Sequence, residues 1–171
     1  MDKELEDLSV RVGQALLDRK SMLACAESCT GGWVAEVVTA TGGSSQWFER
    51  GFVTYSNAAK QELLGVKADT LRRDGAVSEA VVQEMAAGAL RRSHAHAALA
   101  ISGVAGPSGG SPGKPVGTVC FAWVLRGGEP TAETMHFSGD REAVRKQSVV
   151  HALRGLLRRL AEASANIDAS N

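Results

Sequence analysis

The stretch MLACAESCTGGWVAEVV, residues 22–38, has the pattern of a strand followed by a helix. Residues 22–26 form a short apolar run that favours a buried strand. Residues 27–32 end in two glycines and predict a turn. The apolar positions after this turn share the spacing of one helix face: Val34, Val37 and Val38. A turn that follows a buried strand lies at the carboxyl edge of an α/β sheet, where ligands usually bind.

Further elements extend this unit in both directions along the chain. Apolar positions at helical spacing predict four more helices: residues 5–16, 57–64, 78–90 and 149–160. Apolar runs bounded by turn residues predict four more strands: residues 51–55, 97–102, 117–125 and 131–137. The last two strands read as a hairpin, so the sheet is mixed. The order predicts a single-domain α/β protein, a three-layer α/β/α sandwich over residues 1–163, with a frayed tail over residues 164–171.

Charge and composition limit the classes of partner and compartment. The chain has 19 basic and 19 acidic residues, and this balance removes the electrostatic attraction that nucleic-acid binding needs. The N-terminal segment is acidic, and no run approaches the roughly 20 apolar residues that span a bilayer. Three cysteines without a CxxC pair favour a reduced compartment. We therefore expect a cytoplasmic protein with no nucleic-acid or membrane partner.

Three segments have the residue types that chemistry requires: residues 27–32, 43–60 and 101–113. The first and the third are glycine-rich loops after predicted buried strands, and backbone N–H groups in such loops can approach an anion. Neither is a Walker A loop, because Lys114 is followed by Pro115 where that motif has Ser or Thr. The glycines can equally serve only to make tight turns.

The middle segment contains the only tyrosine of the chain, Tyr55, together with Lys60. Lysine can deprotonate a serine only when it is neutral, and burial lowers its pKa from about 10.4. Lys60 has apolar neighbours on its predicted helix, but a lysine on a helix is more often a solvated surface group. Cys29 precedes a predicted helix and is a minor alternative nucleophile. His94 and His96 form a pair without a third ligand nearby, so no metal site is expected.

Six ordered strings resemble the CinA C-terminal domain family. They are AESCTGGWVA (26–35), GSSQWFERGFVTYSNAAK (43–60), GAVS (75–78), ISGVAGPSGG (101–110), KPVGTV (114–119) and FSGDREAVR (137–145). The resemblance extends from about Leu5 to Leu160 and concerns the form without a second domain. It implies hydrolysis of nicotinamide mononucleotide to nicotinate mononucleotide and ammonia, in pyridine-nucleotide recycling. It also implies a serine–lysine mechanism without a metal or other cofactor.

The resemblance also implies roles for individual residues. Ser45 is the first choice for the nucleophile, with Lys60 as its base and Tyr55 as an assisting hydroxyl. Ser28 is the alternative nucleophile, and Ser44 adjoins Ser45. The expected substrate-binding residues come from the two glycine-rich loops and the segment before the last helix: Thr30, Gly31, Gly32, Ser102, Gly103, Gly106, Arg141 and Arg145. Among them, the turn after the first strand and one of the two arginines are expected to bind the phosphate.

A second class of function is a non-catalytic nucleotide-binding or interaction module, in which the glycine loops only bind a ligand. The enzyme requires Lys60 to be paired with a hydroxyl, whereas the binding module does not. A homo-oligomer is the default expectation for a small protein of this kind.

Overall fold

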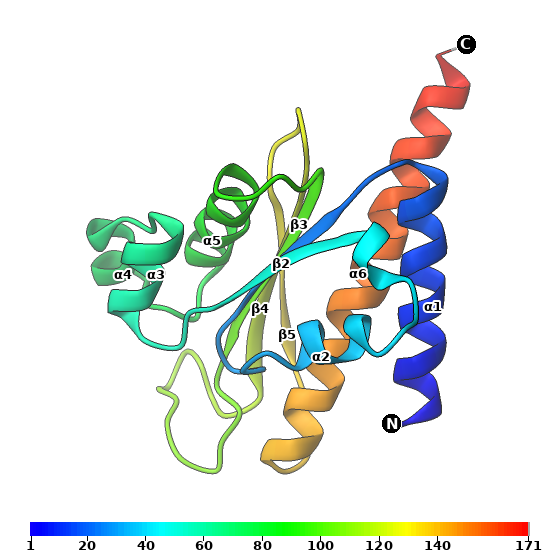
Figure 1. Ribbon diagram of the computed structural model, residues 1–171. Helices are drawn as coiled ribbons and strands as arrows, with labels where there is room; N and C mark the ends of the chain where they lie inside the picture. The colour runs from blue at the N-terminus through cyan, green and yellow to red at the C-terminus, as the bar shows by residue number, and fades with distance from the viewer. Residues whose placement is uncertain (171) are drawn as a thin grey trace.

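The computed structural model describes residues 1–170, which contain a five-stranded sheet between two layers of helices (Figure 1). The strands are β1 (Leu23–Glu27), β2 (Phe48–Val53), β3 (Ala97–Gly103), β4 (Thr118–Leu125) and β5 (Thr131–His136). Their order in the sheet is β2-β1-β3-β4-β5. Strand β1 is parallel to β2 and β3, while β4 and β5 are antiparallel to their neighbours. The predicted single-domain sandwich with a mixed sheet is confirmed.

Two helix layers cover the sheet. The helices are α1 (Lys3–Asp18), α2 (Trp33–Thr39), α3 (Asn57–Leu64), α4 (Ala68–Asp74), α5 (Glu79–Arg91) and α6 (Arg141–Ala169). Helices α1, α2 and α6 pack on one face, and α3, α4 and α5 pack on the other (Figure 1). Among the residues described, no helix is long and apolar enough to cross a membrane.

The side chains of the central strand β1 alternate between the two cores. Leu23 and Cys25 belong to the core under α1, α2 and α6, whereas Ala24 and Ala26 belong to the core under α5. All residues of β1 are buried, which explains why the strand reads as a continuous apolar run rather than as an alternating pattern. The small alanines also allow α5 to pack closely on the sheet.

The parallel register of β1, β2 and β3 brings three chain segments to one edge of the sheet. Glu27 pairs with Val53 on one side and with Ile101 on the other. The segments that follow these three residues therefore leave the sheet side by side, at its lower edge in Figure 1. These segments contain most of the candidate residues named from the sequence.

Three elements differ from the sequence-based expectations. Strand β2 begins at Phe48 rather than at Gly51. Helix α4 has no counterpart among the predicted elements, because its seven residues include only two apolar ones besides the charged positions. Helix α6 begins at Arg141, continues to Ala169 and extends beyond the sheet, which corrects the predicted helix over residues 149–160 at both ends (Figure 1). Arg19 donates a hydrogen bond of 2.8 Å to Ser164 at the start of this extension.

Candidate active site

Lys60 on α3 is a buried lysine whose residue surface is only 1% exposed. Its Nζ atom donates to Ser28 Oγ at 3.0 Å, to the Thr54 carbonyl at 2.9 Å and to the Tyr55 carbonyl at 3.1 Å. Burial lowers the pKa of Lys60 below its ordinary value of 10.5, while the neighbouring Cys29 acts in the opposite direction. The amine is therefore in a setting that favours its neutral form more than water does.

The three partners of Nζ determine where the lone pair of a neutral amine points. Carbonyl oxygens can only accept hydrogen bonds, so those of Thr54 and Tyr55 bind the two N–H groups of a neutral lysine. The remaining direction, toward Ser28 Oγ, is then left for the lone pair. In this state Lys60 can accept the hydroxyl proton of Ser28, as a general base must.

The fold brings Ser28 and Lys60 together through two parallel strands. Ser28 is the first residue after β1, and its N–H donates to the Ile101 carbonyl at 3.0 Å, so the sheet bonding continues past the strand. Helix α3 begins soon after β2, where the Ser56 hydroxyl accepts a hydrogen bond from the Ala59 N–H at 3.0 Å and caps the helix. This cap places Lys60 in the first turn of α3, beside the end of β1.

Glu27 stabilises the turn that carries Ser28. Its carboxylate is completely buried. One oxygen accepts from the Thr30 hydroxyl at 2.7 Å and from the Val34 N–H at 2.9 Å, and the other accepts from the Ala35 N–H at 3.1 Å. The negative charge thus lies at the N-terminus of α2, where backbone N–H groups favour an anion. The Glu27 carboxylate thus connects the end of β1 to the start of α2. These bonds hold the turn between them, and Ser28 with it, in place.

The two glycines of this turn have a structural role. Gly31 and Gly32 have φ angles of +60° and +103°, which a residue with a side chain adopts only at a cost. The Gly31 N–H closes the turn by donating to the Ser28 carbonyl at 3.0 Å. These glycines, expected to bind substrate, therefore serve first to direct the chain from β1 into α2.

Tyr55 and Arg141 lie at the open side of the Ser28–Lys60 pair. Tyr55 is 64% exposed, and its hydroxyl accepts a long hydrogen bond of 3.5 Å from Arg141. Arg141 also donates to the Gly106 carbonyl at 2.7 Å. The segments after β2 and β3 and the start of α6 therefore meet beside Ser28. The backbone carbonyl of Tyr55 accepts a hydrogen bond from Lys60, whereas the Tyr55 hydroxyl accepts one from Arg141.

A pocket of about 460 Å³ adjoins this region, lined by Trp33, Arg141, Glu142 and Arg145. The guanidinium of Arg145 lies over the Trp33 ring, 5.4 Å from its centroid. Arg145 also donates to the Cys29 carbonyl at 3.0 Å and to the Thr30 carbonyl at 3.1 Å. Two cationic side chains thus line a cavity next to the serine turn.

Ser45 does not lie beside Lys60. It is an exposed residue of the short 3₁₀ helix Ser44–Gln46, which precedes β2, whereas Lys60 follows β2. The six residues of β2 place the two ends of the strand about 20 Å apart. The predicted pairing of Ser45 with Lys60 is therefore wrong, and Ser28, the alternative, has the contact.

Ser102 and Gly103 belong to the end of β3. They pair with Cys120 and Val119 of β4. A Cβ atom at Gly103 would lie 2.7 Å from the Val119 side chain, so close packing accounts for this glycine. Both residues lie at the same sheet edge as Ser28. Their places in the structure follow from the pairing of β3 with β4.

Glu27 and Thr54 have roles in this site that were not expected from the sequence. A glutamate at the end of an apolar strand, directly before a turn and a helix, is a signal that could have indicated a buried helix cap. Thr54 contributes only its backbone carbonyl, which any residue type supplies. The residue type at position 54 therefore could not indicate this role.

Cys29 is a poor candidate for a nucleophile. Burial raises the pKa of its thiol to about 12, so the thiol stays protonated at neutral pH. The histidine pair is also structural in part, because the Nδ1 atom of His96 accepts a hydrogen bond from the Met22 N–H at 3.0 Å. Within residues 1–170, no group of three or more His, Cys, Asp or Glu side chains is arranged to bind a metal ion.

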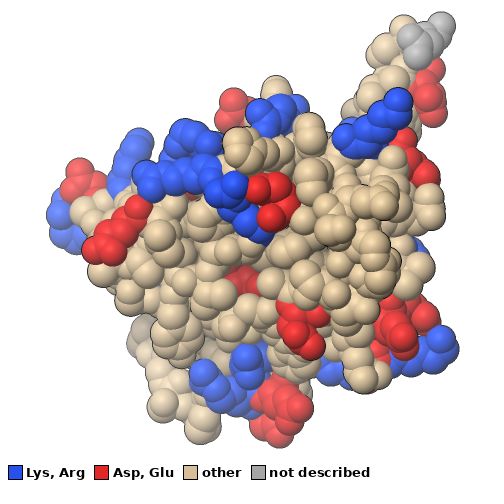
Figure 2. Space-filling model, viewed as in Figure 1, with Lys and Arg blue, Asp and Glu red and all other residues tan. Residues whose placement is uncertain are grey.

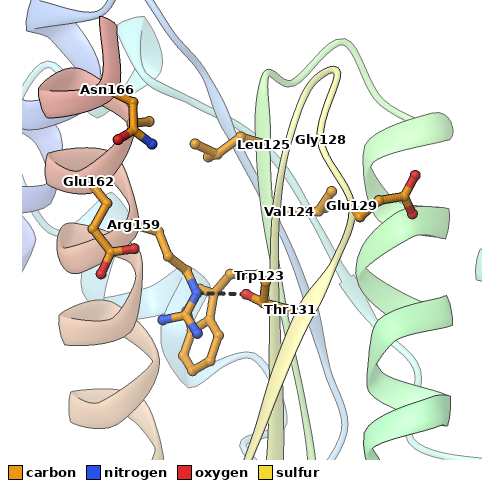
Figure 3. A pocket seen from close by; sticks show the side chains of 10 residues that line it. Trp123, Val124, Leu125, Gly128, Glu129, Thr131, Arg159, Glu162 and Asn166 are labelled. Atoms are coloured by element: carbon orange, nitrogen blue, oxygen red, sulfur yellow. Dashed lines mark hydrogen bonds between the residues drawn. The ribbon is translucent and has the colours of Figure 1, made fainter. Parts of the chain in front are cut away.

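A smaller pocket of about 230 Å³ lies between α6 and the β4–β5 hairpin (Figure 3). Its central cation, Arg159, donates to the Thr131 hydroxyl at 2.9 Å and lies 3.8 Å from the centroid of the Trp123 ring. None of the residues that line it is a lysine, serine or cysteine. This pocket therefore has no counterpart of the Ser28–Lys60 pair.

Basic side chains form a band at the upper left of Figure 2, with acidic side chains among them. Toward the amino ends of the strands, Arg50 is paired with Glu49, and Arg91 donates to the Leu64 carbonyl at the end of α3. Arg92 donates to the Glu62 carbonyl of the same helix. The contacts of Arg91 and Arg92 stabilise the C-terminus of α3.

Comparison with known proteins identifies relatives of this arrangement. Residues 5–160 match the family described as CinA C-terminal domain. The nicotinamide-nucleotide amidohydrolase PncC of Escherichia coli (strain K12) is 57% identical over 155 residues, which cover 91% of this chain and 94% of that protein. The nicotinamide-nucleotide amidohydrolase PncC of Pseudomonas putida is 53% identical over 150 residues, covering 88% of this chain and 93% of that protein.

Solved structures have the same fold. A CinA superfamily protein from Klebsiella pneumoniae superposes with a TM-score of 0.89 at 46% identity, covering 92% of this chain and 98% of that one. The competence/damage inducible protein CihA from Agrobacterium tumefaciens has a TM-score of 0.88 at 42% identity, covering 91% of this chain and 94% of that one.

Proposed function

The chain belongs to the CinA C-terminal domain family, and we propose that it hydrolyses the carboxamide of nicotinamide mononucleotide to give nicotinate mononucleotide and ammonia. The observation that carries this proposal is the buried Lys60 amine, 3.0 Å from the Ser28 hydroxyl. The names of relatives that match more than nine-tenths of the chain support the substrate and the reaction.

In the first half of the proposed reaction, Ser28 forms an ester with the substrate. Neutral Lys60 takes the hydroxyl proton of Ser28 as its oxygen attacks the carboxamide carbon. The resulting tetrahedral intermediate has a negative oxygen, which the peptide N–H groups of the turn after Ser28 stabilise. Protonated Lys60 then gives its proton to the nitrogen, the C–N bond breaks, and ammonia leaves.

In the second half, water replaces ammonia. Lys60 is neutral again and takes a proton from a water molecule, whose oxygen attacks the ester carbon. The C–O bond to Ser28 breaks, Ser28 recovers its proton from Lys60, and nicotinate mononucleotide leaves. One base thus serves both halves, because it returns to its neutral state after each proton transfer.

The phosphate of the substrate is proposed to lie in the pocket between α2 and α6. Arg141 lines this pocket and is exposed, so it can donate to phosphate oxygens. Tyr55 adjoins Arg141, and its hydroxyl is proposed to act in substrate binding rather than as a proton relay to Lys60. The Trp33 ring forms one wall of the pocket.

The alternative, a non-catalytic nucleotide-binding module, is less well supported. Burying a lysine amine costs free energy, because the charged form loses its hydration. A binding module would gain nothing from this cost at Lys60, whereas a hydrolase gains a neutral base at Ser28. The cytoplasmic location, the role in pyridine-nucleotide recycling, the absence of a cofactor and a homo-oligomeric state remain predictions.

A direct assay tests the proposed function. Purified protein is incubated with nicotinamide mononucleotide in excess EDTA, and ammonia and nicotinate mononucleotide are measured. We expect stoichiometric release of both, and loss of both in Ser28→Ala and Lys60→Ala proteins that remain folded by circular dichroism. A folded wild-type protein that binds the nucleotide but releases no ammonia would instead support the binding module.

A further inference from the structure

Arg145 directs two of its hydrogen bonds to the backbone of the serine turn. Its Nε atom donates to the Cys29 carbonyl at 3.0 Å, and its Nη2 atom donates to the Thr30 carbonyl at 3.1 Å. Its stacking on the Trp33 ring further limits its movement. A planar guanidinium that binds two successive carbonyls restrains the orientation of two successive peptide units.

The orientation of these peptide units follows from their planarity. In a trans peptide the C=O and N–H groups point in opposite directions. In the unit that joins Thr30 to Gly31, the carbonyl faces Arg145 and the N–H donates to the Ser28 carbonyl, as expected. In the unit that joins Cys29 to Thr30, the carbonyl also faces Arg145, so the Thr30 N–H points away from the guanidinium.

The Thr30 N–H is a donor without a bonded acceptor. Across residues 1–170, it makes no hydrogen bond to a protein group, and neither do the N–H groups of Cys29 and Gly32, whereas those of Ser28 and Gly31 donate to backbone carbonyls. Its residue is completely buried, and the Thr30 hydroxyl is fixed by the Glu27 carboxylate at 2.7 Å. The turn therefore contains a peptide N–H without a protein acceptor, two residues after Ser28.

We infer that Arg145 is a positioning residue, which orients the Cys29–Thr30 peptide so that the Thr30 N–H binds the oxygen that becomes negative when Ser28 attacks. The inference rests on the proposed hydrolysis. A cation on the peptide carbonyl also polarises the unit, which strengthens its N–H as a donor. Arg145 acts through the backbone of Thr30 and does not itself touch the reacting atoms.

This role differs from phosphate binding in the kinetic constant that it affects. A phosphate ligand binds the substrate equally in the ground state and the transition state, so its loss raises KM and weakens product binding. A group that orients an oxyanion donor acts only once negative charge develops, so its loss lowers kcat and leaves KM in place. The two roles of Arg145 are therefore separable by experiment.

The test compares Arg145→Met with Arg154→Met. Arg154 lies on the same helix and binds Glu4 at the surface, so it controls for the loss of an α6 arginine. For Arg145→Met we expect kcat to fall about 10- to 100-fold, because one oxyanion donor is worth about 10²–10³ in kcat and would be misdirected rather than removed. KM for nicotinamide mononucleotide and Kd for nicotinate mononucleotide, measured by calorimetry, should stay within about twofold of wild type. Arg154→Met should match wild type in all three constants.

The kinetics of Arg145→Lys and the change in KM and product Kd are two further tests of this role. Arg145→Lys keeps the cation but not the two-pronged geometry, so it should recover only part of kcat, again without a change in KM. It also provides the kcat and KM values if Arg145→Met does not fold. A tenfold or greater rise in KM and in product Kd, with kcat intact, would identify Arg145 as a phosphate ligand and overturn the inference alone. A folded wild-type protein without ammonia release would overturn the proposed function as well.

Discussion

The Nζ atom of Lys60 lies 3.0 Å from the Oγ atom of Ser28, and this contact is buried at the carboxyl edge of the sheet. The carbonyls of Thr54 and Tyr55 occupy the other two directions around the amine. Because both carbonyls can only accept, the serine is the one partner of Lys60 from which the amine can take a proton.

Replacing Ser28 should abolish hydrolysis, whereas replacing Ser45 should not. Ser28→Ala removes the attacking oxygen, so we expect kcat to fall by at least about 10⁴-fold. Ser45→Ala, in an exposed 3₁₀ helix before β2, should retain activity within about twofold. Ammonia release under saturating substrate measures both. An inactive Ser45→Ala protein with an active Ser28→Ala protein would contradict the assignment of the nucleophile.

The activity should rise with pH across the titration of Lys60. Burial lowers the pKa of this amine, and only the neutral form can act as the base. The acid limb of kcat/KM should therefore have an apparent pKa below 10.5, with the high rate on the alkaline side. The free energy of unfolding should also rise with pH between the lowered pKa of folded Lys60 and 10.5. In this window the unfolded chain binds the proton and the folded chain has released it. A rate that declines as pH rises through this limb would exclude a neutral lysine base.

Cys29 should be dispensable for the reaction. Its thiol adjoins Ser28, but burial raises its pKa to about 12, so very little thiolate forms at neutral pH. We expect Cys29→Ala to keep kcat within about threefold of wild type, since the change removes only a small buried group. Iodoacetamide at pH 7.5 should leave Cys29 of the folded protein unmodified, as measured by peptide mass spectrometry. Rapid labelling coupled to loss of activity would indicate a reactive thiolate.

Gly88 should be essential for the packing that positions Lys60. A Cβ atom at Gly88 on α5 would lie only 1.9 Å from the Leu64 carbonyl oxygen at the end of α3. Gly88→Ala must push the two helices apart, and overpacking of this kind costs about 1–3 kcal/mol. The melting temperature should fall by roughly 2–12 °C for a chain of this length. Because Lys60 lies one turn before Leu64 on α3, kcat should fall as well.

Gly42→Ala is the matched control for this substitution. A Cβ atom at Gly42 would have nothing within 4 Å. We expect its melting temperature and kcat to remain close to the wild-type values. A Gly88→Ala protein as stable as Gly42→Ala would show that α3 and α5 can separate without cost, which the packing described above does not allow.

The order of elements could be read from the sequence because burial leaves a direct pattern. Strand β1 is buried on both faces, so its residues form an apolar run, and the paired glycines after it indicate the turn that their positive φ angles require. Strand β2 is an edge strand with three partly buried and three exposed positions mixed along it, so its start at Phe48 was harder to place.

The pairing of the candidate site could not be read in the same way. The family resemblance was carried over to Ser45, which is also closer to Lys60 along the chain than Ser28 is, and this choice was wrong. A strand between two residues separates them by its full length, whereas two parallel strands bring their carboxyl ends together. Ser28 and Lys60 are 32 positions apart and still in contact. The predicted strand positions did not include the order of the strands in the sheet, so the sequence did not indicate which strand ends would be neighbours.

The amino-acid sequence by itself determined the α/β class, the glycine turn after the central strand and the candidate residue types, because each depends on local spacing and composition. Only the tertiary structure decided which hydroxyl meets the lysine, how deeply the amine is buried and what the arginines contact. These properties depend on strand order and register, which result from the packing of the whole sheet between its two helix layers.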